Sequence, residues 1–203
     1  MHPLNRPARR QLLFLAGALA CLLALLTACD DDSLKPGPEE VGPLTLQATA
    51  PESLITGLMR VYNDVLHDAA ERHAFYADLF PPAAHDSLPG FIFHFQSVDV
   101  EPGEEATWGL DAELSAHENM FNAQAARDIY SLALSLGYAA PEPLGFPEPG
   151  QEDWVMIFVS NCYLRLMFNP QDGLQIDGGQ AEFILAPADD RWYIVDWTDL
   201  PRP

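Results

Sequence analysis

Basic side chains are scarce in this chain of 203 residues, which has ten lysines and arginines against 30 aspartates and glutamates and a formal net charge of −20. Three of those ten, Arg6, Arg9 and Arg10, precede the first long apolar run, so the residues from Cys29 onward have seven basic side chains and a net charge of −23. A surface of this sign repels phosphate backbones and anionic lipid headgroups. We therefore expect no nucleic-acid partner, whereas a neutral or cationic ligand is compatible with the composition.

Cysteine is also scarce, and the three that occur are Cys21, Cys29 and Cys162. The first two lie near the N-terminus, in a segment assigned below to a signal and a lipid, which leaves Cys162 without an internal disulfide partner. Its surroundings in the sequence are strongly apolar, so we expect a buried, unreactive thiol. No two cysteines have the spacing of zinc ligands, and no Gly-x-Ser-x-Gly or phosphate-cradling glycine motif is present.

The one long apolar run extends from Leu12 to Leu26, behind the N-terminal arginines and ahead of an acidic stretch. A basic segment, an apolar run and small residues before a cleavage point form a secretory signal peptide. Residues 26–29, Leu-Thr-Ala-Cys, resemble the lipobox of bacterial lipoproteins, in which the cysteine is lipidated and begins the mature chain. This resemblance implies acylation, with palmitate among the attached chains, at Cys29, and a lipid-anchored protein of the bacterial cell envelope. Asp30 after the cysteine favours the inner membrane, on its periplasmic side.

Three alternatives remain for this segment. Residues 12–28 number 17, at the short edge of what spans a bilayer, although the acidic residues that follow differ from a basic stop-transfer flank. The signal could also be cleaved without lipidation. A second candidate lipobox ends at Cys21, but it would leave a short apolar region before the cut and six more apolar residues on the mature chain.

The rest of the chain divides into a tether and one domain. Residues 29–48 are rich in proline, glycine and acidic side chains, a composition that cannot bury a core and predicts an extended tether. Residues 49–203 have the length and apolar content of a single domain. The predicted domain organisation is therefore a signal peptide over 1–28, a tether over 29–48 and one folded domain over 49–203.

The order of elements in the domain predicts an α+β fold. Helical spacing of apolar residues predicts one long helix over 51–79, with Thr49 and Glu52 as a capping box, and a shorter helix over 111–126. Aromatic and β-branched residues predict strands over 91–95, 129–136, 154–168, 174–186 and 191–197. The last strand is apolar on both faces, so we predict that it is central, lies beside another long strand as well as 180–186, and directs Trp192 and Trp197 to opposite faces.

The closing hairpin, formed by 181–185 and 191–197, together with the long first helix and the helical segment after Trp108, resembles the nuclear-transport-factor-2-like (SnoaL-like, cystatin-like) superfamily. The likeness extends over about residues 50–199. It implies a bent antiparallel sheet that forms a cone, with helices packed on it and a pocket at the open end.

The resemblance directs attention to polar side chains near the cone, because members with enzymatic activity often pair a base with a hydrogen-bond donor there. The cavity candidates are His94, Tyr130, Tyr163 and Asp196, and no catalytic residue is assigned. Two helical pairs, His67 with Glu71 and Glu113 with His117, have the four-residue spacing of metal ligands. Such pairs are common on helix surfaces, so we expect no metal and no cofactor.

Two function hypotheses follow. The first is a lipid-anchored, non-enzymatic domain that binds a small apolar ligand or a protein partner. The second is a small-molecule isomerase, dehydratase or hydrolase that uses His94 and a carboxylate in the cone. A hollow cone in which His94 and Asp196 meet would favour the enzyme.

Overall fold

The structure is a computed structural model that describes residues 42–96, 100 and 105–201. The signal segment, Cys29, Asp30 and residues 31–41 of the predicted tether lie outside these residues. Within the described ranges, no helix is long and apolar enough to cross a membrane.

In the described residues, seven strands form one sheet in the order β2-β1-β7-β6-β5-β3, with β4 paired to β5 outside this path. The strands are β1 (Ile92–His94), β2 (Thr107–Gly109), β3 (Ser131–Tyr138), β4 (Glu142–Pro143), β5 (Val155–Asn169), β6 (Asp172–Ala188) and β7 (Arg191–Leu200). The pairing of β1 with β7 is parallel and the other pairings are antiparallel. The α+β class is thus confirmed, with a mixed sheet where an antiparallel one was predicted. The strand β7 is central as predicted, but its second neighbour is the short β1.

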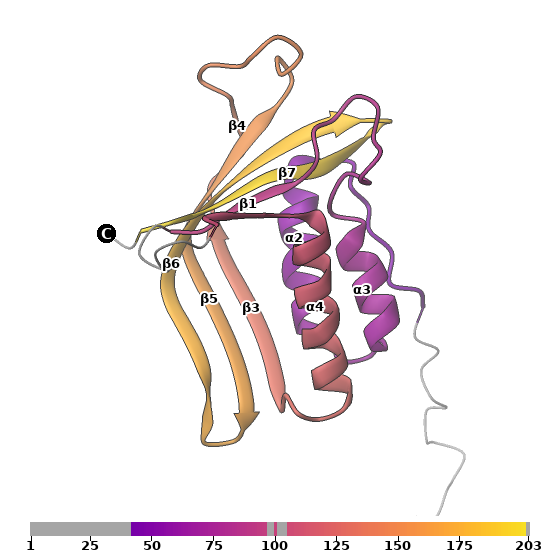
Figure 1. Cartoon of the computed structure of the whole chain (residues 1–203), viewed down its shortest axis with the longest axis vertical. Coiled ribbons are helices and arrows are strands. Elements are labelled where there is room, and N and C mark those ends of the chain that lie inside the picture. Colours follow the sequence, from indigo (N-terminus) through magenta and orange to yellow (C-terminus); the bar gives the residue numbers. More distant parts are fainter. Residues whose placement is uncertain (1–41, 97–99, 101–104, 202–203) are drawn as a thin grey trace, which may run out of the picture. The chain divides into compact units, whose positions relative to one another are not determined.

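The sheet bends where its strands carry extra residues. The pairing of β5 with β6 shifts between Val159 and Cys162 and again between Cys162 and Tyr163, opposite Gly178. Gly178 has a φ of 77°, a conformation that glycine adopts without steric cost. A β-bulge of this kind turns the strand and reverses which face its later side chains occupy. In Figure 1, β5 and β6 are the long strands that bend at the left of the view, with the concave side of the bend toward the helices.

A further bulge in β7 overturns one prediction about the tryptophans. Ile184 of β6 pairs with Asp196 while Leu185 pairs with Ile194, so Val195 is the extra residue. Val195 and its neighbours form a small apolar cluster on the outer face of the sheet, whereas Trp192 and Trp197 both pack against the main core. The prediction that these tryptophans face opposite sides is wrong because strict alternation assumed an unbroken pleat.

Three helices lie on one face of the sheet in the described residues: α2 (Pro51–Asn63), α3 (Ala69–Ala77) and α4 (Leu110–Ala125) (Figure 1). The prediction of a single helix over 51–79 is wrong. The chain forms two helices, α2 and α3, because the side chains of Asp64 and Asp68 bond to backbone N–H groups between them. The Asp64 carboxylate accepts the backbone N–H groups of Leu66 and His67, and Asp68 forms a capping box with Glu71 at the start of α3. The capping box predicted at Thr49 does not form, since Ala50 is the N-cap of α2.

A buried arginine joins the three helices. Arg72 of α3 donates from Nε and Nη2 to the carbonyl of Val61, in the last turn of α2, and from Nη1 to the side chain of Gln124 in α4 at 2.6 Å. Its guanidinium carbon lies 4.3 Å from the centre of the Phe121 ring. These contacts satisfy the C-terminal end of α2 and compensate part of the cost of burying a cation.

The described end of the predicted tether packs on the domain. Leu44 and Leu46 contact the main core, and the carbonyl of Ala48 accepts the backbone N–H of Trp192 at 2.8 Å. Ala48 itself is buried. Residues 44–48 therefore add a segment of extended chain to the domain.

Candidate functional site

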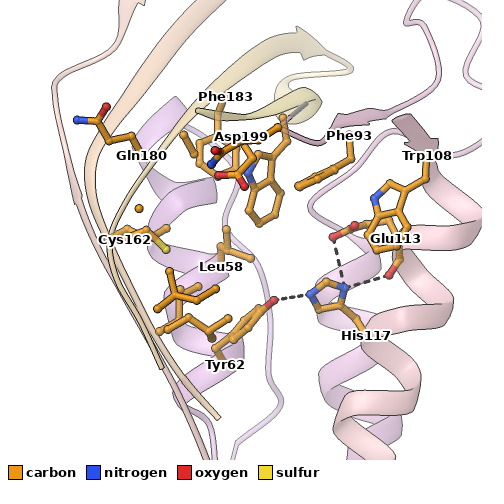
Figure 2. Close-up of a pocket in the computed structure, with 18 of the residues that line it drawn as sticks. Leu58, Tyr62, Phe93, Trp108, Glu113, His117, Cys162, Gln180, Phe183 and Asp199 are labelled. Carbon is orange, nitrogen blue, oxygen red and sulfur yellow. Dashed lines mark hydrogen bonds and ion pairs between the residues drawn. The ribbon is translucent and has the colours of Figure 1, made fainter. Parts of the chain in front are cut away.

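A cavity of about 740 Å³ lies between the inner face of the sheet and helices α2 and α4 (Figure 2). Most of its lining is apolar or aromatic and comes from both layers: Leu58, Phe93, Trp108, Leu134, Leu136, Cys162, Leu164, Ile176, Ala181, Phe183 and Trp197. The polar side chains in the lining are Tyr62, Gln96, Glu113, His117, Gln180 and Asp199. An apolar cavity of this size with a few polar groups is typical of a small-molecule site.

Four polar side chains from three helices meet at the deep end of the cavity. The carboxyl group of Glu113 on α4 accepts the hydroxyl of Tyr76 on α3, and the hydroxyl of Tyr62 on α2 bonds to Nε2 of His117 on α4. The Nδ1 atom of His117 lies 2.9 Å from the Glu113 carbonyl oxygen and 3.3 Å from a Glu113 carboxyl oxygen. The rings of Tyr76 and His117 stack with centroids 4.0 Å apart. We call Tyr62, Tyr76, Glu113 and His117 the polar cluster.

The hydrogen bonds assign the proton on His117. A carbonyl oxygen only accepts, so Nδ1 carries the proton and Nε2 accepts from Tyr62. Burial is the main reason that the pKa of His117 is lowered to about 4; the hydrogen bond to the Glu113 carbonyl opposes this change and nearby His73 adds to it. The imidazole is therefore neutral at physiological pH.

The carboxyl group of Glu113 has the opposite perturbation. Glu113 is only 1% exposed, and this burial raises its pKa, while the hydrogen bond from Tyr76 and the nearby Trp108 indole N–H lower it. The Trp108 indole N–H is buried and lies near this carboxyl group without a hydrogen bond of normal geometry. Burial and nearby Glu113 also raise the pKa of both Tyr62 and Tyr76, which keeps their hydroxyls protonated as donors.

Aromatic rings form a second wall of the cavity. Phe93 on β1 lies 5.6 Å from Trp108 on β2 and 5.3 Å from Trp197 on β7, measured between ring centroids. Phe183 on β6 continues the wall at 4.6 Å from Trp197. Asp199 lies near Phe183, at the end of the cavity away from Leu58 and Tyr62 (Figure 2). Gln96, Gln180 and Asp199 are only partly buried, so this end is the mouth.

The four cavity candidates from the sequence lie elsewhere than in the lining of this cavity. His94 and Asp196 do meet, with Nε2 2.8 Å from Oδ2, but on the outer face of the sheet, since their neighbours Phe93 and Trp197 are the ones that line the cavity. Tyr130 precedes β3 and is 63% exposed. Tyr163 lies between Cys162 and Leu164 on β5, and these two neighbours line the cavity while Tyr163 does not.

The residues that sequence reasoning did not place in the cavity are the polar cluster and Asp199. The helical spacing of Glu113 and His117 did single them out, as a possible metal pair. Their spacing could not indicate that they are buried against Tyr62 and Tyr76, because this burial depends on how three helices pack. In the described residues, no group of three or more His, Cys, Asp or Glu side chains is arranged to hold a metal ion.

No family model and no curated protein matches this sequence. Among solved structures, the chain is similar to the Kfla4162 protein from Kribbella flavida, with a TM-score of 0.48, 8% identity and coverage of 73% of this chain and 85% of that one. It is also similar to an NTF-2 like protein of unknown function from Shewanella oneidensis MR-1, with a TM-score of 0.44, 14% identity and coverage of 73% and 93%. A third is an uncharacterized protein with a cystatin-like fold from Caulobacter vibrioides, with a TM-score of 0.43, 14% identity and coverage of 73% and 84%. At these identities and TM-scores the likeness concerns the fold and carries no argument about chemistry.

Proposed function

We propose that this chain is a lipid-anchored protein of the bacterial cell envelope whose domain binds a small, mostly apolar molecule. The observation that carries the binding function is the cavity of about 740 Å³, walled by leucines and aromatic rings with hydrogen-bonding groups at both ends. The envelope location rests on the signal-like N-terminus and on Cys29. A domain that holds a ligand at the membrane surface combines the two.

The experiment is a titration of the purified domain with N-phenyl-1-naphthylamine, a neutral apolar dye that fluoresces on transfer from water. We expect saturable binding to the wild-type protein. Cys162 lies in the cavity lining on β5, so Cys162→Trp should fill the space and abolish dye binding. The matched control is Tyr163→Trp, one residue along β5 and facing away from the cavity, which should bind the dye like the wild type.

Dye binding that survives in Cys162→Trp would place the dye outside the cavity and contradict the proposal. Lack of binding to the wild type by the dye and by a panel of small apolar molecules would contradict it as well. Circular dichroism melts of both variants show whether each has kept its fold.

A second function, proton transfer on the bound molecule, is favoured by Glu113. A carboxylate held in an apolar cavity is a stronger base than one in water. It could take a proton from a carbon next to a ligand carbonyl and return it at another carbon, an isomerisation that needs no other reactant. The Tyr62 hydroxyl lies at the same end and donates to Nε2 of His117, so it would have to exchange that acceptor for the intermediate oxyanion in order to stabilise it.

Deuterium exchange tests this second function. A small ketone that binds in the cavity should exchange its α-hydrogens in D2O faster with the wild-type domain than with Glu113→Gln, as followed by proton NMR. Equal exchange rates with both proteins, at equal ketone binding, would leave the binding function standing alone.

A further inference from the structure

The charged side chains in the described part of the cavity lining are of one sign. Glu113 at the deep end and Asp199 at the mouth are the carboxylates of the lining, and in the described lining there is no lysine or arginine. The imidazole of His117 is neutral, as argued above. A ligand carboxylate or phosphate entering this space would lose its hydration and approach the carboxyl groups of two acidic side chains.

The uncharged part of the lining suits a cation. Phe93, Trp108, Phe183 and Trp197 belong to the same lining as the two carboxylates, and aromatic rings attract alkylammonium groups through their quadrupole. The sequence as a whole has a net charge of −20, so the long-range field also draws cations toward the mouth.

We propose that the ligand of this cavity is an apolar organic cation, an alkyl- or arylalkylamine whose ammonium group lies between Asp199 and the aromatic wall. This inference rests on the proposed binding function and specifies its ligand class. The hydrocarbon part then points inward, toward Leu58, Leu134 and Leu164.

The depth of the two carboxylates decides the orientation of the amine. Glu113 is 1% exposed and already accepts the Tyr76 hydroxyl, so an ammonium group beside it would give up nearly all its hydration. Asp199 is only partly buried, so water can still solvate part of an ammonium group paired with it. Burial raises the pKa of the Cys162 thiol, and nearby Asp199 raises it as well, which agrees with the place of both residues in the cavity lining. Placing the ammonium group beside Asp199 therefore costs less desolvation free energy than placing it beside Glu113.

The test compares three molecules with the same hydrocarbon skeleton and different head groups: 4-phenylbutylamine, 4-phenylbutan-1-ol and 4-phenylbutyrate. Each is titrated into the domain at pH 7.5 by isothermal calorimetry, at low and at high salt. We expect the amine to bind about tenfold more tightly than the alcohol, which corresponds to one partly desolvated cation–π and ion-pair contact. The carboxylate should bind most weakly, and of the three molecules only the amine should lose affinity when salt is added.

Asp199→Asn should reduce the preference for the amine to less than about threefold and leave the alcohol unchanged. The matched control is Asp196→Asn, on the same strand but the outer face, which should keep the full preference. If a thermal melt shows that Asp199→Asn does not fold, Gln180→Lys at the mouth provides the test. A cation at this position should lower the affinity for the amine and raise the affinity for the carboxylate.

The outcomes separate the two proposals. An alcohol that binds the wild type as tightly as the amine, or a carboxylate that binds best, would overturn the inference while the binding function stands. Amine preference that persists in Asp199→Asn would overturn the placement of the ammonium group. If neither the three molecules nor the neutral dye binds the wild type, both proposals fail.

Discussion

The protonation state of His117 gives the sharpest prediction about stability. His117 lies in the polar cluster with its side chain almost fully buried, and its pKa is lowered to about 4 from an ordinary value of 6.5. The groups that face it are Tyr62 on α2, His73 and Tyr76 on α3, and Glu113 on its own helix. We predict that this histidine makes the folded domain less stable as the pH falls below 6.5.

The sign follows from linkage between folding and proton binding. In the unfolded chain His117 takes up a proton as the pH falls through 6.5, while in the folded domain it stays neutral until about pH 4. Between these values the unfolded state binds more protons, so lowering the pH favours unfolding. The shift corresponds to about 2 kcal/mol of unfolding free energy lost at pH 5 and about 3 kcal/mol at pH 4, relative to pH 7.5. That is a large share of the about 5–15 kcal/mol that stabilises a typical domain.

The assay is urea denaturation of the wild type and of His117→Gln at pH 7.5, 6 and 5. The other titratable groups are the same in both proteins, so the difference in unfolding free energy between variant and wild type reports on His117. Between pH 7.5 and pH 5 this difference should shift by about 2 kcal/mol in favour of the variant. His94→Gln, on the outer face, is the control for replacing any histidine. A constant difference from pH 7.5 to 5, or an NMR titration of the His117 ring with its midpoint near 6.5, would refute the reasoning.

Three further predictions concern the anchor, the core and the buried carboxyl group. In the producing cell, Cys29→Ser should abolish labelling by radioactive palmitate and release the processed protein from the membrane fraction; membrane partitioning after complete processing would contradict the anchor. Trp192→Ala should cost about 3 kcal/mol, because the ring is partly buried against the core, and lower Tm by about 6–12 °C in a calorimetric melt. Glu113→Gln should gain stability relative to the wild type between pH 5 and pH 8, because a carboxyl group with a raised pKa contributes stability that is lost as the pH rises through that pKa. Urea denaturation at the two pH values measures this gain, and a difference that falls with pH would contradict the sign.

Much of the fold could be predicted from the sequence because local patterns carry it. Helical spacing located the helix after Trp108, and aromatic and β-branched runs located the long strands within a few residues. The break between α2 and α3 was missed because apolar residues such as Val65 and Leu66 fill the helical pattern through it. Both side chains are highly exposed in the structure, so their apolar character does not mark a buried helix face. The capping function of Asp64 and Asp68 was the signal that could have found the break.

The site was harder to predict because its parts come from separate elements. The pair His94 and Asp196 was named from the sequence and does meet, yet on the outer face. Glu113 and His117 were recognised as neighbours on one helix face, but only the packing of α4 against α2 and α3 brings the two tyrosine hydroxyls to them. Sequence spacing reports neighbours along one element, and burial by other elements is a property of the tertiary structure.

The acidic character of the cavity depends on a backbone feature as well as on residue types. Val195 is the extra residue of the β7 bulge, and beyond it Trp197 and Asp199 face the cavity while Asp196 and Thr198 face outward. If β7 alternated regularly through Val195 without a bulge, Asp196 and Thr198 would face inward and Trp197 outward, so the aromatic wall would lose Trp197. The bulge in β5 acts in the same way on Cys162, which continues the inner face begun by Val159. The same bulges that bend the sheet around the space between the layers therefore also decide which side chains line that space.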